Sequence, residues 1–171
     1  MLLLQCTRKV SKRFGLRLEN VPETPIPTSL GVWYVNLLED VWGYDFLLFV
    51  NNPTLYTLAV PIWDPKSPPN LESAFKQHLF SAWIAEGFHT DLVARKIAEY
   101  EPTIYAKTSS RRILGHLNSQ TKNLYAYIEQ AIDVYEGVVN LATIQQRLNR
   151  IPQQALDWNY AIEALRAHLK A

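Results

Sequence analysis

The alternation of hydrophobic and polar residues predicts a β-hairpin in the first half of the chain. Residues 46–50 (FLLFV) form an unbroken apolar run of strand length, which is typical of a strand covered on both faces. An Asn-Asn-Pro-Thr loop follows, and residues 55–60 then alternate between two faces before Pro61 ends the strand. Residues 32–38 are rich in aromatic and β-branched side chains and add a further strand. The pattern therefore predicts an antiparallel meander over residues 32–60.

Two further short strands are expected outside the meander, and each leads directly into a helix. The strand near residues 2–5 precedes a helix that Thr7 can cap, and the strand near residues 103–107 precedes a helix that starts at Arg111. We expect this second helix to break at Asn118-Ser119 and to resume as far as Gly137.

The remaining sequence has the periodicity of helices. Apolar residues recur at three- and four-residue spacing from Leu71 to Trp83, behind Asn70 as an N-cap. Further helices are expected over residues 140–149 and from Pro152 onward. We predict a single α+β domain over residues 1–171, with a small, mostly antiparallel sheet, helices packed largely on one face and an all-helical C-terminal third.

Composition adds few constraints. A chain of 171 residues with 48% hydrophobic content can bury one core, and a net charge of +1 excludes a strongly polyionic protein. The single cysteine, Cys6, cannot form an internal disulfide, and the first residues lack the features of a signal peptide. No stretch approaches the roughly 20 apolar residues of a membrane span. These observations predict a cytoplasmic protein without a membrane partner.

Four motifs carry a family resemblance. They are residues 4–9 (LQCTRK), 33–38 (WYVNLL), 48–56 (LFVNNPTLY) and 112–118 (RILGHLN). With these motifs, which span roughly its first two thirds, the chain resembles an uncharacterised bacterial domain family of unknown function. Because that family has no assigned activity, the resemblance implies the fold and leaves the function open.

Cations are segregated along the sequence. Residues 1–18 contain five Lys or Arg and residues 102–128 contain four, and neither block contains an acid. If the two short strands run parallel, both blocks begin at one edge of the sheet and form one electropositive surface that binds nucleic acid or another phosphate-bearing ligand. The alternative is that both blocks are solvated helix faces. The ligand-binding residues of this hypothesis are Arg8, Lys9, Lys12, Lys107, Ser109, Ser110, Arg111 and Arg112.

Catalytic chemistry has weaker support in the sequence. Cys6 and His116 are the candidate catalytic residues, with Asn118 or neighbouring cations as helpers toward a phosphodiester, but no set has diagnostic spacing. A buried structural role is the alternative for both. The four His and one Cys lack zinc-site spacing, and the six Gly form no phosphate loop. We therefore predict a non-enzymatic protein without metal or cofactor.

Large aromatic residues suggest a second kind of function. Trp42 and Tyr44 precede the central strand and Trp63 lies in a proline-rich loop, where exposure would favour binding to another protein. The favoured alternative is that these side chains fold back and cover the sheet, because large aromatics gain free energy from burial.

Overall fold

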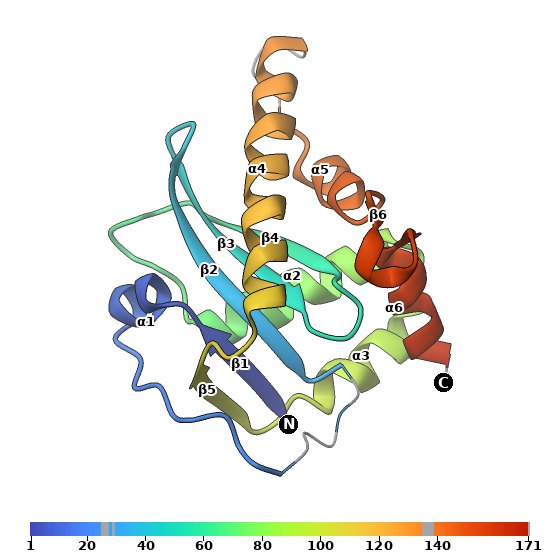
Figure 1. Ribbon diagram of the computed structural model, residues 1–171. Helices are drawn as coiled ribbons and strands as arrows, with labels where there is room; N and C mark the ends of the chain where they lie inside the picture. The colour runs from blue at the N-terminus through green and yellow to red at the C-terminus, as the bar shows by residue number, and fades with distance from the viewer. Residues whose placement is uncertain (25–27, 29, 135–138, 171) are drawn as a thin grey trace.

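The computed structural model describes residues 1–24, 28, 30–134 and 139–170, and it shows an α+β protein built on a five-stranded sheet (Figure 1). In chain order the elements are β1 (Leu2–Cys6), α1 (Arg8–Phe14), β2 (Val32–Val41), β3 (Tyr44–Asn51), β4 (Thr57–Ile62), α2 (Leu71–Ala85), α3 (Thr90–Ala98), β5 (Thr103–Lys107), α4 (Arg111–Val134), α5 (Leu141–Leu148), β6 (Pro152–Gln153), the 3-10 turn η1 (Gln154–Leu156), β7 (Asn159–Tyr160) and α6 (Ala161–Lys170).

The sheet is mixed, and the prediction of a mostly antiparallel sheet was wrong. Its strand order is β4-β3-β2-β1-β5, with β1 parallel to both of its neighbours and the meander β2-β3-β4 antiparallel as predicted. All five residues of β1 are buried, including Gln5. Burial on both faces is typical of strands with parallel neighbours, so β1 lies inside the sheet.

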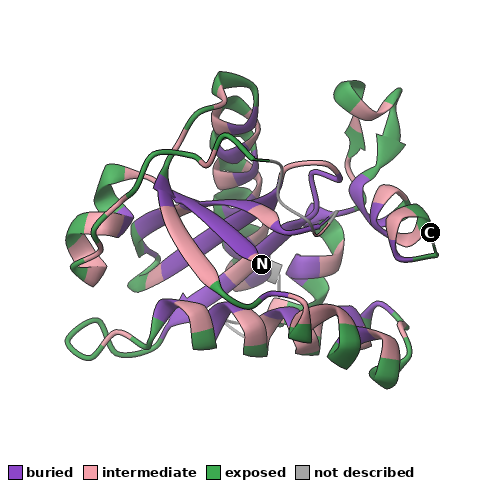
Figure 2. Cartoon of the chain, turned by 90° about the horizontal axis from the view of Figure 1, so that it is seen from below, coloured by how far each residue is buried: buried purple, intermediate pink, exposed green. Residues whose placement is uncertain are grey.

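Helices cover both faces of the sheet, which corrects the prediction that they pack largely on one. Helices α1, α2, α3 and α6 contribute to the hydrophobic cluster on one face, and α4 and α5 contribute to the cluster on the other. Figure 1 shows α4 in front of the sheet and α2 behind it, and Figure 2 shows the buried strands between helices whose outer surfaces are exposed. Strands apolar on both sides, such as β3, require this double cover.

Helix α4 is continuous, so the predicted break at Asn118-Ser119 was wrong. The Ser119 hydroxyl donates to the carbonyl of Gly115 at 3.2 Å, within the helix. Buried residues also continue through this point at helical spacing, with Leu117, Gln120 and Leu124 facing the sheet. Packing against the sheet therefore overrides the weak helix propensity of Asn and Ser. The predicted end of this helix at Gly137 lies outside the described residues.

The C-terminal third is not all helical. Pro152 does not begin a helix but pairs with Tyr160 in the small hairpin of β6 and β7. Asp157 and Trp158 turn the chain there with φ of 53° and 64°, and the last helix starts only at Ala161. The helical spacing of apolar residues from 155 onward thus predicted α6 but placed its start too early.

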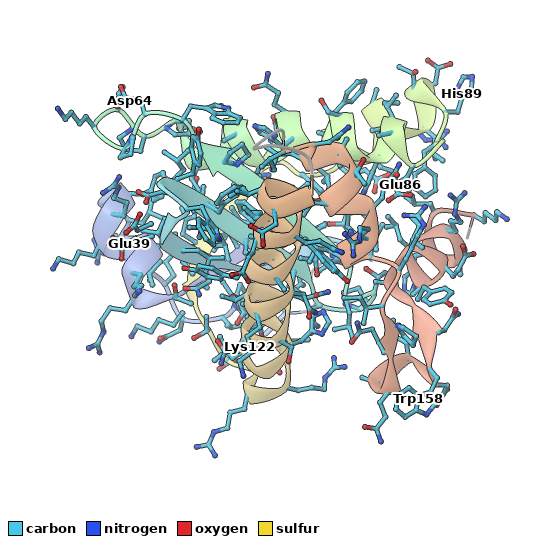
Figure 3. All side chains as sticks on the ribbon, turned by 90° about the horizontal axis from the view of Figure 1, so that it is seen from above. Glu39, Asp64, Glu86, His89, Lys122 and Trp158 are labelled. Atoms are coloured by element: carbon cyan, nitrogen blue, oxygen red, sulfur yellow. The ribbon has the colours of Figure 1, made fainter. Side chains whose placement is uncertain are left out.

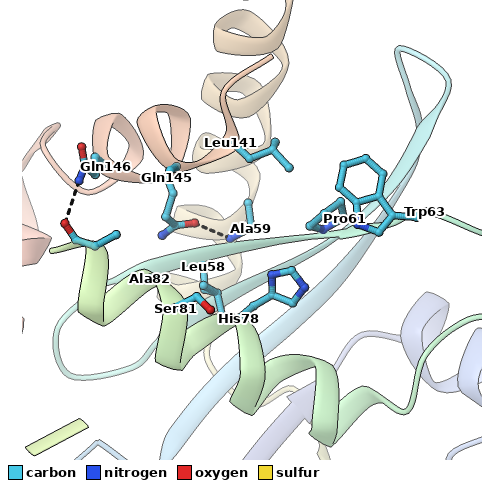
Figure 4. A pocket seen from close by; sticks show the side chains of 12 residues that line it. Leu58, Ala59, Pro61, Trp63, His78, Ser81, Ala82, Leu141, Gln145 and Gln146 are labelled. Atoms are coloured by element: carbon cyan, nitrogen blue, oxygen red, sulfur yellow. Dashed lines mark hydrogen bonds between the residues drawn. The ribbon is translucent and has the colours of Figure 1, made fainter. Parts of the chain in front are cut away.

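Side chains of α5 and of the residue after it cover the free edge of the sheet at β4. Asn149 Oδ1 accepts from the Thr57 amide and Asn149 Nδ2 donates to the Thr57 carbonyl, both at 2.7 Å. Gln145 Oε1 accepts from the Ala59 amide at 2.8 Å, a bond drawn in Figure 4, and Gln145 Nε2 also donates to the Thr57 carbonyl. Two amide side chains thus satisfy backbone groups that a further strand would otherwise pair.

Candidate anion-binding site

The two basic blocks begin at one edge of the sheet. Strands β1 and β5 are parallel neighbours, and Cys6 at the end of one is opposite Lys107 at the end of the other. After these strands the chain turns to opposite faces, because Val10 of α1 and Ile113 of α4 belong to different hydrophobic clusters. In open sheets with parallel strands, such a divergence of neighbouring connections is where ligands bind.

A polar hollow of about 480 Å³ lies between α1 and α4. Its lining residues are Lys9 of α1, the β2 residues Asn36, Leu37, Leu38 and Glu39, and the α4 residues Asn118, Thr121, Lys122 and Tyr125. Figure 3 shows Lys122 on α4 and Glu39 beside α1. One cation from each basic block therefore lines the same hollow, which we call the basic hollow.

Helical spacing explains how α4 presents its side chains to the basic hollow. Arg111, Asn118, Lys122 and Tyr125 follow one another at intervals of seven, four and three residues, so they form one outward stripe. Gly115 lies on the same stripe, and a Cβ there would have no neighbour within 4 Å. The stripe is therefore open to a ligand between the first turn of the helix and Asn118.

The floor of the basic hollow is polar within an otherwise apolar strand. The Thr7 hydroxyl donates to Asn36 Oδ1 at 2.9 Å, so Thr7 forms no side-chain cap on α1 and instead orients this amide. Sequence reasoning passed over Asn36, although a polar residue in the run VWYVNLL was a usable signal. Asn36 adds amide N–H donors to a hollow that already contains two ammonium groups.

The electrostatics of this region are only partly balanced. Lys9 pairs with Glu39 at 3.6 Å, but both side chains are more than half exposed, so the pair is weak. Arg13 pairs with Asp45 at 3.3 Å. Among the described residues, no carboxylate lies within 4.0 Å of Arg8, Lys12, Lys107, Arg111 or Arg112. The continuous electropositive surface across both blocks stays a prediction.

The two serines before α4 have different roles. Ser109 donates from its amide and its hydroxyl to Gln5 Oε1 at 2.8 and 2.9 Å, and its oxygen also lies 3.1 Å from the Tyr34 hydroxyl. Ser110 Oγ accepts a long bond of 3.4 Å from the Ile113 amide. Ser109 therefore fixes the end of β5 to β1, and its donors are already used within the protein.

Cys6 and His116 do not form a catalytic pair. Cys6 is in the core on the α2 face, where burial raises the pKa of its thiol to about 12, and a thiol is a poor nucleophile. His116 is on α4 at the opposite face, and burial, together with the charge of Arg112, lowers its pKa. Its Nε2 is buried and has no hydrogen-bond partner among the described residues. Both side chains are packed within the fold.

The exposed aromatic residues overturn one expectation. Trp42, Tyr44 and Trp63 do not fold back over the sheet, since they are 50%, 49% and 67% exposed. Tyr44 and Trp63 pack edge to face with ring centroids 5.8 Å apart. Together with apolar residues of β3, α4 and α5, the three line a pocket of about 220 Å³. By contrast, Trp33 and Trp83 are fully buried.

A further pocket of about 210 Å³ lies between α2, β4 and α5 (Figure 4). Its lining is mainly apolar, and His78 and Ser81 of α2 border it together with Gln145. Burial lowers the pKa of His78, so this imidazole is neutral at pH 7. Because none of the described residues that line this pocket carries a charge, the pocket does not fit an anion. The lining residues are Leu58, Ala59, Pro61, Trp63, His78, Ser81, Ala82, Ala85, Leu141, Ala142, Gln145 and Gln146.

Comparison with known proteins identifies a family. Residues 3–164 match the family described as "Domain of unknown function (DUF6933)", and the chain belongs to this family. No curated protein matches the sequence. Within the described ranges, no helix is both long and apolar enough to cross a membrane. The same ranges hold no group of three His, Cys, Asp or Glu residues that a metal ion would need.

Proposed function

We propose that this protein, a member of a family without an assigned activity, is a binding module for a phosphate-bearing ligand. The ligand class includes nucleic acid, in which many phosphates are linked in one chain. One observation carries the proposal: Lys9 and Lys122, which are 113 positions apart in the numbering of the chain, line the same hollow. The segregation of cations along the sequence supports a basic surface. The basic hollow supports a defined position on that surface at which a ligand binds.

The chemistry of the basic hollow fits a phosphate group with an attached organic body. Two ammonium groups and the amides of Asn36 and Asn118 are suited to phosphate oxygens. Tyr125 closes the hollow at one end with a side chain that is 37% exposed, which offers a surface for base stacking. A volume of about 480 Å³ falls within the usual range of ligand sites. Glu39 limits the net charge and so favours a ligand with donors of its own.

The proposal is a binding function without catalysis. A buried thiol with a raised pKa and a histidine on the other face of the sheet supply no nucleophile at the basic hollow. We further propose a cytoplasmic location and a bacterial source, which rest on the single cysteine and on the family resemblance of the motifs.

The test measures binding of a short fluorescent single-stranded RNA by anisotropy at several salt concentrations. We expect the double variant Arg111→Ala, Lys122→Ala to bind about tenfold more weakly or worse, with a salt slope lower by about 0.7 for each phosphate that the variant no longer neutralises. Arg95→Ala, Lys170→Ala is the matched control, because it removes two exposed cations from α3 and α6. Equal weakening by the control, or an unchanged affinity of the double variant, overturns the proposal.

A second candidate function is binding to another protein through the exposed aromatic residues. The exposure of Trp42, Tyr44 and Trp63 around an apolar pocket favours it, because aromatic anchors dominate interface energetics. A partner that co-purifies independently of salt should be identified, purified and rebound. The partner should then bind the double variant Tyr44→Ala, Trp63→Ala more weakly than the unchanged protein. The control variant Trp158→Ala, at an exposed position of the β6/β7 hairpin, should bind the partner normally.

A further inference from the structure

A second hollow follows the basic hollow along α4. It has a volume of about 410 Å³ and is lined by Asp40, Trp42, Tyr125 and Glu129. Tyr125 borders both hollows, and Glu129 is the next outward residue of the same stripe, four positions further on. The proposed function does not use Asp40, Trp42 or Glu129. We call this site the acidic hollow.

The turn between β2 and β3 positions Asp40 and Trp42, the two lining residues that do not belong to α4. The strand register shifts between Leu38 and Val41, and Asp40 and Trp42 take φ of 56° and 52°. Asp45 Oδ1 accepts from the Asp40 amide at 3.1 Å and holds this turn. The turn thereby brings a carboxylate and an indole to the same hollow as Tyr125 and Glu129.

The four lining residues share an affinity for positive charge. Trp42 and Tyr125 are 50% and 37% exposed, so both rings are open to a ligand. Neither Asp40 nor Glu129 has a cationic side chain within 4.0 Å among the residues that the structure describes. Aromatic faces attract cations through the ring quadrupole, and the two carboxylates add direct attraction. The acidic hollow therefore combines two kinds of cation-binding group around one space.

Helix stability does not explain the two acidic residues of α4. A carboxylate is unfavourable toward the C-terminal end of a helix, where the dipole favours cations. Yet Glu129 and Asp133 lie in the last two turns of α4, and the last turn has no basic residue. The helix dipole therefore gives no reason for a carboxylate at this part of α4, and Glu129 is free to serve the hollow that it lines.

We infer that the acidic hollow binds an alkylammonium cation. The rings of Trp42 and Tyr125 contact the methyl or methylene groups around the nitrogen, and Asp40 and Glu129 balance its charge. A bare metal ion fits poorly, because two carboxylates and two aromatic walls do not supply the six or more oxygen ligands of calcium or the octahedral shell of magnesium. An alkylammonium ion uses both kinds of wall.

The first experiment is an NMR titration of the full chain with choline, followed at the Trp42 indole N–H. We expect a saturable shift, and a much smaller one with the uncharged isostere in which a tert-butyl group replaces the trimethylammonium group. Sodium chloride at equal ionic strength should give no saturable shift. Equal binding of the isostere, or no saturation with choline, overturns the inference.

Variants then assign the binding groups, and here choline binding is followed at the backbone amides of Tyr125 and Glu129, because Trp42→Asn removes the indole probe. Trp42→Asn should weaken choline binding about fivefold or more, because it removes a ring while Asn tolerates a positive φ. Asp40→Asn keeps the turn for the same reason and removes one charge, and Glu129→Gln does so on α4. Trp158→Ala is the control, as another exposed Trp on a positive-φ turn. Loss of binding in the control, or none in Trp42→Asn, contradicts the site.

A further arm separates sources of the cation. A peptide that contains one trimethylated lysine is titrated beside free choline, and tighter binding of the peptide assigns the cation to a protein side chain. RNA affinity should stay unchanged in Trp42→Asn. A failure of the acidic hollow is therefore distinguishable from a failure of the basic hollow.

Discussion

The two ends of the outward stripe of α4 carry opposite charge on the same helix face. Toward the helix start, Lys122 lines the basic hollow together with α1 and the middle of β2, and Arg111 precedes it on the stripe in the first turn of the helix. Beyond Tyr125, Glu129 faces the β2–β3 turn with Asp40 and Trp42. Both ends share the fold, the helix and the sheet below them. The difference shows that one rigid element holds two chemically opposed hollows side by side.

This arrangement opposes the helix dipole at both ends. The first turn holds Arg111 and Arg112 and no acid, and the last turn within the described residues holds Asp133 and no base. The reverse placement stabilises a helix by about 0.3–1 kcal/mol per charge. Continuous packing of α4 on the sheet compensates for this loss, since Ile113, Leu117, Leu124 and Ile128 are all buried. The buried face of α4 therefore determines the stability of the helix, and its exposed face is free to bind ligands.

The largest loss of stability is expected at Gln120, the buried residue that fixes the middle of α4 to the rest of the fold. Gln120 is fully buried, and its Nε2 donates to Thr57 Oγ1 at 3.1 Å and to the Leu148 carbonyl at 3.0 Å. Gln120→Ala removes these bonds and leaves buried groups unpaired, so the free energy of unfolding should fall by about 2–3 kcal/mol in urea denaturation. Gln130→Ala, at an exposed position of the same helix, should cost far less.

Any weakening of ligand binding by Gln120→Ala should appear at both hollows, because the variant shifts the whole helix. An effect confined to one hollow would show that α4 does not act as one rigid element.

A charge reversal at the acidic end should convert it to the chemistry of the basic end. Glu129→Lys extends the basic stripe past Tyr125, so RNA affinity measured by anisotropy should rise by about threefold to tenfold and choline binding should disappear. Glu163→Lys changes the net charge equally from α6. If it raises RNA affinity as much, the gain comes from net charge and the two hollows are not adjacent parts of one stripe.

The smallest change in stability is expected at Gly115, which lies on α4 between Ser110 and the basic hollow. A Cβ at this position meets nothing within 4 Å, so Gly115→Ala should raise the free energy of unfolding by about 0.5–1 kcal/mol and leave both ligands bound. Gly87→Ala is the matched control and should destabilise, because Gly87 has a φ of +87°. Abolished RNA binding in Gly115→Ala would place the ligand directly against the backbone of α4.

Local sequence patterns predicted the elements better than their arrangement. The meander, the strands at residues 2–5 and 103–107 and the helix after Asn70 follow from alternation and spacing, and Asn70 Oδ1 does accept from the Ser73 amide. The parallel pairing of β1 was not predicted, although the apolar run at residues 2–4 is typical of a strand that is buried on both faces. Parallel neighbours are distant in sequence, so no local pattern records which strands pair.

Composition marked the two basic blocks, but of the eight residues predicted to bind a ligand only Lys9 lines the basic hollow. The absence of acids marked both basic blocks, and the parallel pairing of β1 with β5 fulfilled the condition for a common edge. Which side chains converge depended on the face that α4 presents, so Lys122, rather than the first-turn serines, lines the same hollow as Lys9. The acidic hollow had no sequence signal, because Trp42 and Glu129 meet only through a register shift in the β2–β3 turn.

The cover of the β4 edge by Gln145 and Asn149 has a consequence for the order in which the chain is made. During synthesis β4 is complete after residue 62, but Asn149 lies 92 positions after its partner Thr57. A nascent chain that has not yet reached α5 exposes an unpaired strand edge, the surface through which partly folded chains aggregate. Chains that lack α5 keep this edge open, so we expect fragments that end before α5 to accumulate as insoluble material.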